Sequence, residues 1–170
     1  DKECEQPDTR TWALHGDKET RGNLVTSITL QNELQEQHNI KLQEKYAAMA
    51  CEASAESWLT EDADIILTGY GISGRIARTA VEFLRSEGIK AGFFRPQTLF
   101  PFPEKQLQEV AFQTPNRQIL VVELSNGQYR DDVRLHLGDR MLPVHFIQRM
   151  GGMLLEVNDI VEEARKIAKR

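Results

Sequence analysis

Several residue types and motifs that mark functional sites are scarce in this sequence. It has two cysteines and four histidines in 170 residues, and none of them stands at a metal-ligand spacing. Cys4 lies in a polar leader and Cys51 in a helical pattern, so the pair makes a poor disulfide framework and we expect reduced thiols. No nucleophile elbow, Walker loop, HExxH or CxxC motif is present. The sequence therefore shows no catalytic constellation and no metal site of its own.

Long apolar runs and an excess of positive charge are also missing. No run approaches the ~18 apolar residues that a membrane span needs, and no signal-peptide pattern is present. The net charge is −5 and the pI is about 5.4, so no overall positive field attracts nucleic acid or an anionic membrane. The basic residues of 165–170 fall at a predicted helix C-terminus, where cations offset the helix dipole. We expect a cytoplasmic protein that binds neither nucleic acid nor membrane.

The residues that are present divide the chain into three predicted parts. With 40% hydrophobic and 28% charged residues, the composition is that of a globular protein, and the length suits one domain with an appendage. Residues 1–26 are polar and aperiodic, which predicts an extended arm or inter-domain linker with Trp12 and Leu14 as docking points. Residues 27–60 carry apolar side chains three or four positions apart. This spacing predicts one long amphipathic helix, or two that break near Asn39.

The third part, residues 61–170, alternates between two kinds of pattern. Continuous apolar runs bounded by turn residues predict strands buried on both faces, and the segments between them carry the single apolar stripe of amphipathic helices. The predicted strands are 64–70, 89–95, 118–124 and 142–147, and the predicted helices include 73–87 and a last one with Asn158 as its N-cap. The alternation predicts right-handed crossovers. We therefore predict a three-layer α/β/α fold with a mainly parallel sheet of about five strands.

A glycine pattern lies between the first of these strands and the helix that follows it. Gly69, Gly71 and Gly74 match the G-x-G-x-x-G pattern of a dinucleotide-binding turn. A dinucleotide site also needs an acid about 20 residues later, whereas the next strand ends in phenylalanines and Arg95, which suits only the extra phosphate of NADP. Glycines at these positions also simply permit a tight turn from strand to helix. We favour the tight turn and keep NADP binding as the alternative.

Loops at the carboxyl ends of parallel strands converge on one edge of a sheet, where ligands or partners dock. In this chain that edge collects residues 71–75, 96–103, 123–128 and 148–152. Glu123 ends an aliphatic strand, and we expect its carboxylate either to be functional or to cap the next helix. The segment Pro101-Phe102-Pro103 is rigid and apolar, which is typical of packing against another protein surface.

Five segments of the chain, taken in order and at compatible spacing, resemble one protein family. They are Ala63-Asp-Ile-Ile-Leu-Thr-Gly-Tyr-Gly-Ile-Ser-Gly-Arg-Ile-Ala-Arg78, Leu84-Arg-Ser-Glu-Gly-Ile-Lys-Ala-Gly-Phe-Phe-Arg-Pro96, Thr98-Leu-Phe-Pro-Phe-Pro103, Val121-Val-Glu-Leu-Ser-Asn-Gly-Gln128 and Asp132-Val-Arg134. They are similar to the C-terminal domain of the α subunit of 2-oxoacid:ferredoxin oxidoreductases, a domain similar to the transketolase C-terminal domain. Residues 15–23 resemble the connection that enters this domain, although they depart from the commoner histidine-containing version. A chain that begins with Asp1 is expected to be a piece of a longer subunit.

The resemblance implies an enzyme that decarboxylates a 2-oxoacid oxidatively. Its cofactors are thiamine diphosphate, magnesium, coenzyme A and iron–sulfur clusters, which pass electrons to ferredoxin. In this family thiamine is held mainly by the preceding pyrimidine-binding domain and by the partner subunit, so the resemblance assigns no cofactor to this chain. It implies that domain and the other subunits as partners, with a possible homodimer. A branched-chain 2-oxoacid or 2-oxoglutarate is the expected substrate of the whole enzyme.

Two hypotheses from different classes follow. In the first, the chain is a scaffold domain, inactive in isolation, whose strand-end loops pack on the pyrimidine-binding domain or on a partner subunit. Its candidate anion or interface contacts are Gly71, Ser73, Gly74, Arg75, Glu123 and Gln128. In the second, the chain is a free-standing NADP-binding oxidoreductase domain that uses Gly69, Gly71, Gly74 and Arg95. A small-anion regulatory site at the helix start, residues 73–75, is compatible with the first hypothesis.

Overall fold

The computed structural model describes residues 7–23, 28–138, 140 and 142–169. The chain divides into two compact units, Asp1–Ala47 and Ala48–Arg170, and each is considered by itself. Cys4, whose thiol we expect to be reduced, and the expected boundary between residues 26 and 27 lie outside the described residues.

The described part of the predicted arm is folded by local polar contacts. Thr20 is 2% exposed, and both its backbone N–H and its hydroxyl donate to one carboxylate oxygen of Asp17, at 2.8 and 2.6 Å. These hydrogen bonds hold the pKa of Asp17 below its usual value. Trp12 and Leu14 are more than half exposed. The arm is therefore a series of turns, and the docking role of its two apolar side chains stays a prediction.

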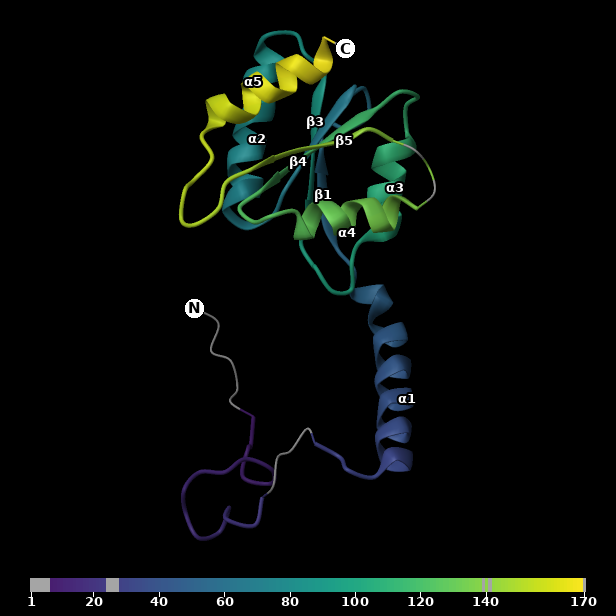
Figure 1. Cartoon of the computed structure of the whole chain (residues 1–170), viewed down its shortest axis with the longest axis vertical. Coiled ribbons are helices and arrows are strands. Elements are labelled where there is room, and N and C mark those ends of the chain that lie inside the picture. The colour runs from purple at the N-terminus through teal and green to yellow at the C-terminus, as the bar shows by residue number, and fades with distance from the viewer. Residues whose placement is uncertain (1–6, 24–27, 139, 141, 170) are drawn as a thin grey trace. The chain divides into compact units, whose positions relative to one another are not determined.

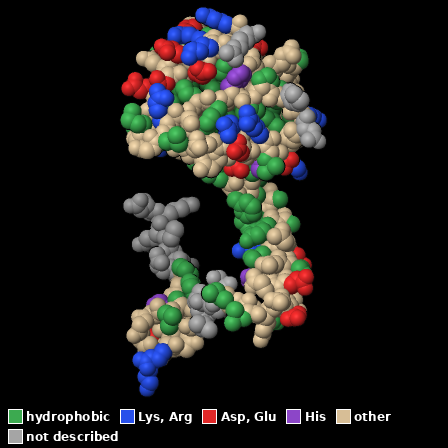
Figure 2. Space-filling model, in the orientation of Figure 1, with side chains coloured by type: hydrophobic (Ala, Val, Ile, Leu, Met, Phe, Trp, Pro, Cys, Tyr) green, Lys and Arg blue, Asp and Glu red, His purple; other side chains and the backbone are tan. Residues whose placement is uncertain are grey.

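Helix α1 (Asn32–Met49) and a short 3-10 turn η1 (Ala50–Glu52) are shorter than the predicted helix 27–60. No residue of α1 is buried, and hydrophobic side chains are exposed along it (Figure 2). The prediction was wrong for its last part, because Ala55–Trp58 forms strand β1. Those residues pair with a neighbouring strand, and this tertiary pairing overrides the helical pattern of the local sequence.

A five-stranded sheet organises the second unit, with strands in the order β1-β3-β2-β4-β5 (Figure 1). Strand β1 runs antiparallel to β3, and all other neighbours are parallel. The further strands are β2 (Ile65–Thr68), β3 (Ala91–Pro96), β4 (Gln118–Glu123) and β5 (Val144–Gln148). The helices between and after them are α2 (Gly71–Ser86), α3 (Glu104–Phe112), α4 (Gln128–Leu137) and α5 (Val157–Ala168). The predicted α/β class with a mainly parallel sheet of about five strands is confirmed.

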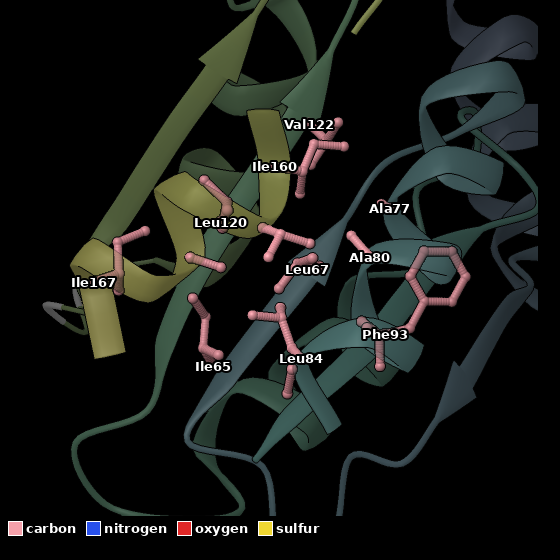
Figure 3. Close-up of a cluster of buried hydrophobic side chains, with 14 of the residues drawn as sticks. Ile65, Leu67, Ala77, Ala80, Leu84, Phe93, Leu120, Val122, Ile160 and Ile167 are labelled. Carbon is pink, nitrogen blue, oxygen red and sulfur yellow. The ribbon is translucent and has the colours of Figure 1, made fainter. Parts of the chain in front are cut away.

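Two hydrophobic clusters pack against the two faces of this sheet. Ile65 and Leu67 of β2 point into the cluster with α2 and α5, whereas Ile66 between them points to the opposite face with α3 and α4. Figure 3 shows the first cluster, in which Ala77 and Ala80 of α2 lie beside the strand side chains. Successive residues of a strand point to opposite faces, so strands covered on both faces read as continuous apolar runs.

The N-terminus of α5 differs from its prediction. The helix is capped by Glu156, whose side chain accepts from the backbone of Asp159, while the Asp159 side chain accepts from the Glu156 backbone. This reciprocal pair is a capping box, which satisfies two backbone donors at once. Asn158, the predicted N-cap, lies inside the first turn instead.

Candidate functional site

A crevice lies at the carboxyl ends of β2 and β4, where the chain reverses its direction across the sheet. From β2 the chain crosses to β3 on one side, and from β3 it returns to β4 on the other side. The loops after β2 and β4 therefore lead apart, and open α/β sheets bind ligands at this switch point. The crevice has a volume of about 260 Å³ and is lined by Tyr70, Gly71, Ile72, Ser73, Glu123, Leu124 and Ser125.

Each glycine of the turn before α2 has its own steric reason. A Cβ on Gly69 would lie 2.8 Å from the carbonyl oxygen of Val122, and one on Gly74 would lie 2.8 Å from the carbonyl oxygen of Gly69. Both glycines therefore allow α2 to start close against β2 and β4. Gly71 has φ +56° and faces open space, so it is required by backbone conformation rather than by packing. The geometry supports the tight-turn interpretation.

The first turn of α2 carries several of the predicted contacts. Its N-cap residue, Tyr70, makes no side-chain capping hydrogen bond, so the N–H groups of the first turn are without side-chain acceptors. Ser73 is 4% exposed and contributes to the crevice wall, whereas Gly74 is buried behind it and Arg75 is exposed. The structure thus brings Gly71 and Ser73 into one wall, and leaves Arg75 beside it.

Glu123 forms the opposite wall and is 2% exposed. Its Oε1 accepts from the hydroxyl of Ser125 and from the backbone N–H of Tyr129 at 3.1 Å, and its Oε2 accepts from the N–H of Arg130 at 3.2 Å. The carboxylate thus caps α4 and lies at the positive end of the helix dipole. The capping interpretation is confirmed. Gln128, the first residue of α4, is exposed and is absent from the crevice lining.

A buried hydroxyl pair fastens α4 to β2 beneath the crevice. The hydroxyls of Thr68 and Tyr129 are 2.6 Å apart, and the two residues are 0% and 1% exposed. Burial raises the pKa of Tyr129 well above its usual range. The ring of Tyr70 stands edge-on to the ring of Tyr129, with centroids 5.2 Å apart, and partial burial followed by the charge of Glu123 raises the pKa of Tyr70.

The arginine on which the NADP alternative depends is already paired. Arg95 lies 2.7 Å from one carboxylate oxygen of Glu56 in β1, and Arg78 lies 2.8 Å from the other. The guanidinium of Arg78 also stacks over the ring of Trp58, 4.9 Å from its centroid. Glu56 is absent from the predicted site residues, because strand β1, which presents it, was predicted to be part of a helix. An acid for a ribose is missing from the described end of β3, where buried phenylalanines stand.

The proline-punctuated loop after β3 is fastened to the residue that precedes β1. The hydroxyl oxygen of Thr98 accepts a hydrogen bond from the backbone N–H of Ser54 at 3.0 Å, and the same hydroxyl donates to the carbonyl oxygen of Pro101 at 2.9 Å. Phe102 points inward and stacks on His136, with ring centroids 4.1 Å apart. Phe100 is 63% exposed. The loop is thus held in place by the hydrogen bonds of Thr98 and by the stacking of Phe102, and it exposes the apolar side chain of Phe100 to solvent.

The described residues contain no group of three or more His, Cys, Asp or Glu side chains that is able to hold a metal ion. No helix in the described part of the chain is long and apolar enough to cross a membrane.

Comparison with known proteins identifies the family. Residues 63–160 match the family described as "Pyruvate:ferredoxin oxidoreductase core domain II". The chain belongs to this family. The 2-oxoacid:ferredoxin oxidoreductase C-terminal domain, suggested by the sequence motifs, is thereby confirmed, and more than half of the chain lies within the match.

Two curated relatives extend the match beyond this core. The ketoisovalerate oxidoreductase subunit VorB of Methanothermobacter thermautotrophicus is 46% identical over 164 residues, which cover 96% of this chain and 45% of that protein. The 2-oxoglutarate synthase subunit KorA of Methanothermobacter marburgensis is 36% identical over 104 residues, which cover 61% of this chain and 27% of that protein. The chain thus spans less than half the length of these relatives, each of which is named as an enzyme subunit.

Solved structures support the fold. A 2-oxoglutarate:ferredoxin oxidoreductase from Magnetococcus marinus superposes with a TM-score of 0.67 at 17% identity, over 82% of this chain and 24% of that chain. A split-gene transketolase superposes with a TM-score of 0.58 at 22% identity, over 68% of this chain and 41% of that chain. The transketolase C-terminal-like fold is therefore shared at low sequence identity.

Proposed function

We propose that the chain is the C-terminal domain of the α subunit of a thiamine-diphosphate-dependent 2-oxoacid:ferredoxin oxidoreductase. Membership of the family supports the reaction class. The relative with 46% identity is a ketoisovalerate oxidoreductase subunit and another is a 2-oxoglutarate synthase subunit, which supports a branched-chain 2-oxoacid as the first substrate to test and 2-oxoglutarate as the second. Ferredoxin accepts the electrons from the whole enzyme.

The chain itself serves packing between domains or subunits. The observation that carries this proposal is the distribution of exposed apolar side chains in the described residues of the second unit. Seven of nine large ones lie at the carboxyl edge of the sheet, in the loops after β2, β3 and β5 or in the first turn of α2. They are Tyr70, Ile72, Leu99, Phe100, Met150, Met153 and Leu154, and the two elsewhere are Phe83 and Leu135. Apolar surface concentrated on one edge favours a docking surface over solvent exposure.

The occupant of this edge is the preceding part of the same subunit, the pyrimidine-binding domain. The relatives extend well beyond the region that this chain matches, so a subunit of their length contains enough further chain for such a domain. The edge spans four parallel strands about 4.8 Å apart, which gives it a width of roughly 15 Å before the loops are counted. The other subunits and a second copy of the chain are the remaining partners of the assembled enzyme.

The residues of this chain do not fit the iron–sulfur clusters or the magnesium ion of the whole enzyme. An iron–sulfur cluster takes about four cysteine thiolates, and the sequence has two cysteines. The described residues also lack a cluster of acids that would hold magnesium. The clusters and magnesium are therefore assigned to the other domains and subunits, the family resemblance places thiamine diphosphate there as well, and no reaction step is assigned to this chain.

A matched pair of variants on α2 tests the docking role. Ile72 and Phe83 are 57% and 53% exposed, but they lie in the first and last turns of the same helix. We expect Ile72→Asp, placed in the complete subunit with its partner subunits, to lower 2-oxoacid-dependent reduction of ferredoxin and to weaken assembly on size-exclusion chromatography. Phe83→Asp should change neither measurement. Equal effects of the two variants would remove the carboxyl edge from the proposal.

The substrate is tested separately with the unaltered enzyme. Ketoisovalerate and 2-oxoglutarate, with pyruvate for comparison, are supplied with coenzyme A, and reduction of ferredoxin is followed by absorbance. Activity with none of the three would overturn the reaction class. The alternative function, a free-standing NADP-binding domain, would be favoured by micromolar NADPH binding to the 170-residue chain that Gly71→Val abolishes.

A further inference from the structure

The two walls of the switch-point crevice offer a ligand opposite kinds of hydrogen-bonding group. The wall from α2 presents donors, since the N–H groups of its first turn, from Gly71 to Ser73, have no side-chain cap. The wall from β4 presents an acceptor, the carboxylate of Glu123. A helix N-terminus favours negative charge, whereas a carboxylate repels it. A ligand of this crevice must satisfy both walls.

A second observation at the α2 wall also indicates a ligand. Ser73 is 96% buried, yet its hydroxyl has no hydrogen-bond partner among residues 7–23, 28–138, 140 and 142–169. Its oxygen is not among the buried side-chain atoms without a partner in the described residues, so it is reachable by solvent. Because Ser73 lines the crevice, a bound acceptor there can take the hydrogen bond that its hydroxyl offers. Arg75, exposed and free of ion pairs in the described part of the chain, adds positive charge to the same turns.

The Glu123 wall has one hydrogen-bonding position left. An ionised carboxylate offers about four lone-pair sites, and three hydrogen bonds to Glu123 are present, two on Oε1 and one on Oε2. No cation forms an ion pair with Glu123 within the described residues. The remaining site on Oε2 suits a ligand that carries an O–H donor.

We propose that the switch-point crevice binds a small oxyanion that keeps a hydroxyl group, with hydrogen phosphate as its simplest representative. Its oxygens accept from the α2 N–H groups and from the Ser73 hydroxyl, and its own O–H donates to Glu123. A fully deprotonated oxyanion such as sulfate lacks that donor and meets the carboxylate with repulsion alone. The crevice opens on the proposed docking edge and shares Tyr70 and Ile72 with it, but its ligand contacts are the α2 N–H groups, Ser73 and Glu123, so phosphate binding is tested on the 170-residue chain separately from docking.

The test is a titration of the 170-residue chain with inorganic phosphate, followed by the backbone amide resonances of Gly71, Ile72 and Ser73 at constant ionic strength. We expect saturable shifts with phosphate at neutral pH and none with sulfate at the same concentration. A phosphate monoester, which is mostly without its hydroxyl at pH 8 because its second pKa is about 6, should bind more weakly than inorganic phosphate. Equal binding of sulfate and phosphate would overturn the role of Glu123.

Ser73→Ala removes one hydroxyl donor with little change in volume. The dissociation constant for phosphate should rise about tenfold or more, because a hydrogen bond to a charged group is lost. Ser86→Ala, at the other end of α2, is the matched control and should bind as the unaltered chain does. Urea unfolding of both variants verifies the fold. Absence of saturable phosphate binding to the unaltered chain, or an unchanged constant in a folded Ser73→Ala variant, would refute the site.

Discussion

The buried hydroxyl pair beneath the crevice allows a quantitative test of how α4 is held on the sheet. Thr68 and Tyr129 are each other's partners at 2.6 Å, and both are almost fully excluded from water. Tyr129→Phe leaves the Thr68 hydroxyl without a partner in the core, and Thr68→Val does the same to the Tyr129 hydroxyl. An unsatisfied buried hydroxyl costs about 1–3 kcal/mol, so each single variant should lower the free energy of unfolding by that amount.

The double variant distinguishes this explanation from simple loss of packing. With both hydroxyls removed, nothing polar is left unpaired, so we expect Thr68→Val with Tyr129→Phe to be less destabilised than the sum of the single variants by at least about 1 kcal/mol. Urea unfolding followed by circular dichroism gives the three values, provided the denaturant slope is unchanged. Tyr70→Phe is the control, because the Tyr70 ring is 37% exposed, and it should stay within about 0.5 kcal/mol. Additive single effects would refute the reasoning.

Three further predictions concern the same unit. Because burial raises the pKa of Tyr129 above the ~10 of an unfolded tyrosine, the folded chain keeps a proton that the unfolded chain releases. The contribution of Tyr129 to stability should be constant below about pH 10 and fall above it by up to ~1.4 kcal/mol per pH unit. Because the pKa of Tyr70 is also raised, urea unfolding of Tyr129→Phe should show a smaller fall above about pH 10 than the unaltered chain, and an equal fall would contradict the assignment to Tyr129. Gly69→Ala should cost about 1–3 kcal/mol in thermal unfolding, since its Cβ would lie 2.8 Å from the carbonyl oxygen of Val122; a neutral variant would contradict the close approach. Arg117 is 0% exposed and donates to the carbonyls of three residues, so Arg117→Met should destabilise by roughly 3 kcal/mol or more, and a change under 1 kcal/mol would show that those carbonyls find other donors.

Local patterns were sufficient for most of the α/β unit. Strands covered by helices on both faces must be apolar at every position, which is why Ile65 to Leu67 and the corresponding runs were visible in the sequence. The spacing of Ala77, Ala80 and Leu84 gave α2 its inward face for the same reason. The family motifs lie in these segments, so fold class and family followed without coordinates.

Strand β1, at the edge of the sheet, could not be predicted from a local apolar pattern. Ala55–Trp58 is half-exposed and has no apolar run, and its strand conformation depends on pairing with β3, which is remote in sequence. The ion pair of Glu56 with Arg95 follows from that pairing, which sets the two residues opposite each other, and the packing of α2 adds the ion pair with Arg78. The NADP alternative therefore had to stay open until tertiary contacts showed where Arg95 lies.

The sequence by itself determined the alternation of strands and helices, the glycine turn and the family, because each depends on residues that are neighbours in the chain. Only the tertiary structure decided that Ser73 and Glu123, fifty positions apart, share one crevice, and that Glu123 caps α4. The order of strands brings β2 beside β4, and no local pattern encodes that order. The concentration of apolar side chains on one edge likewise became visible only when three separate loops and the first turn of α2 were placed together.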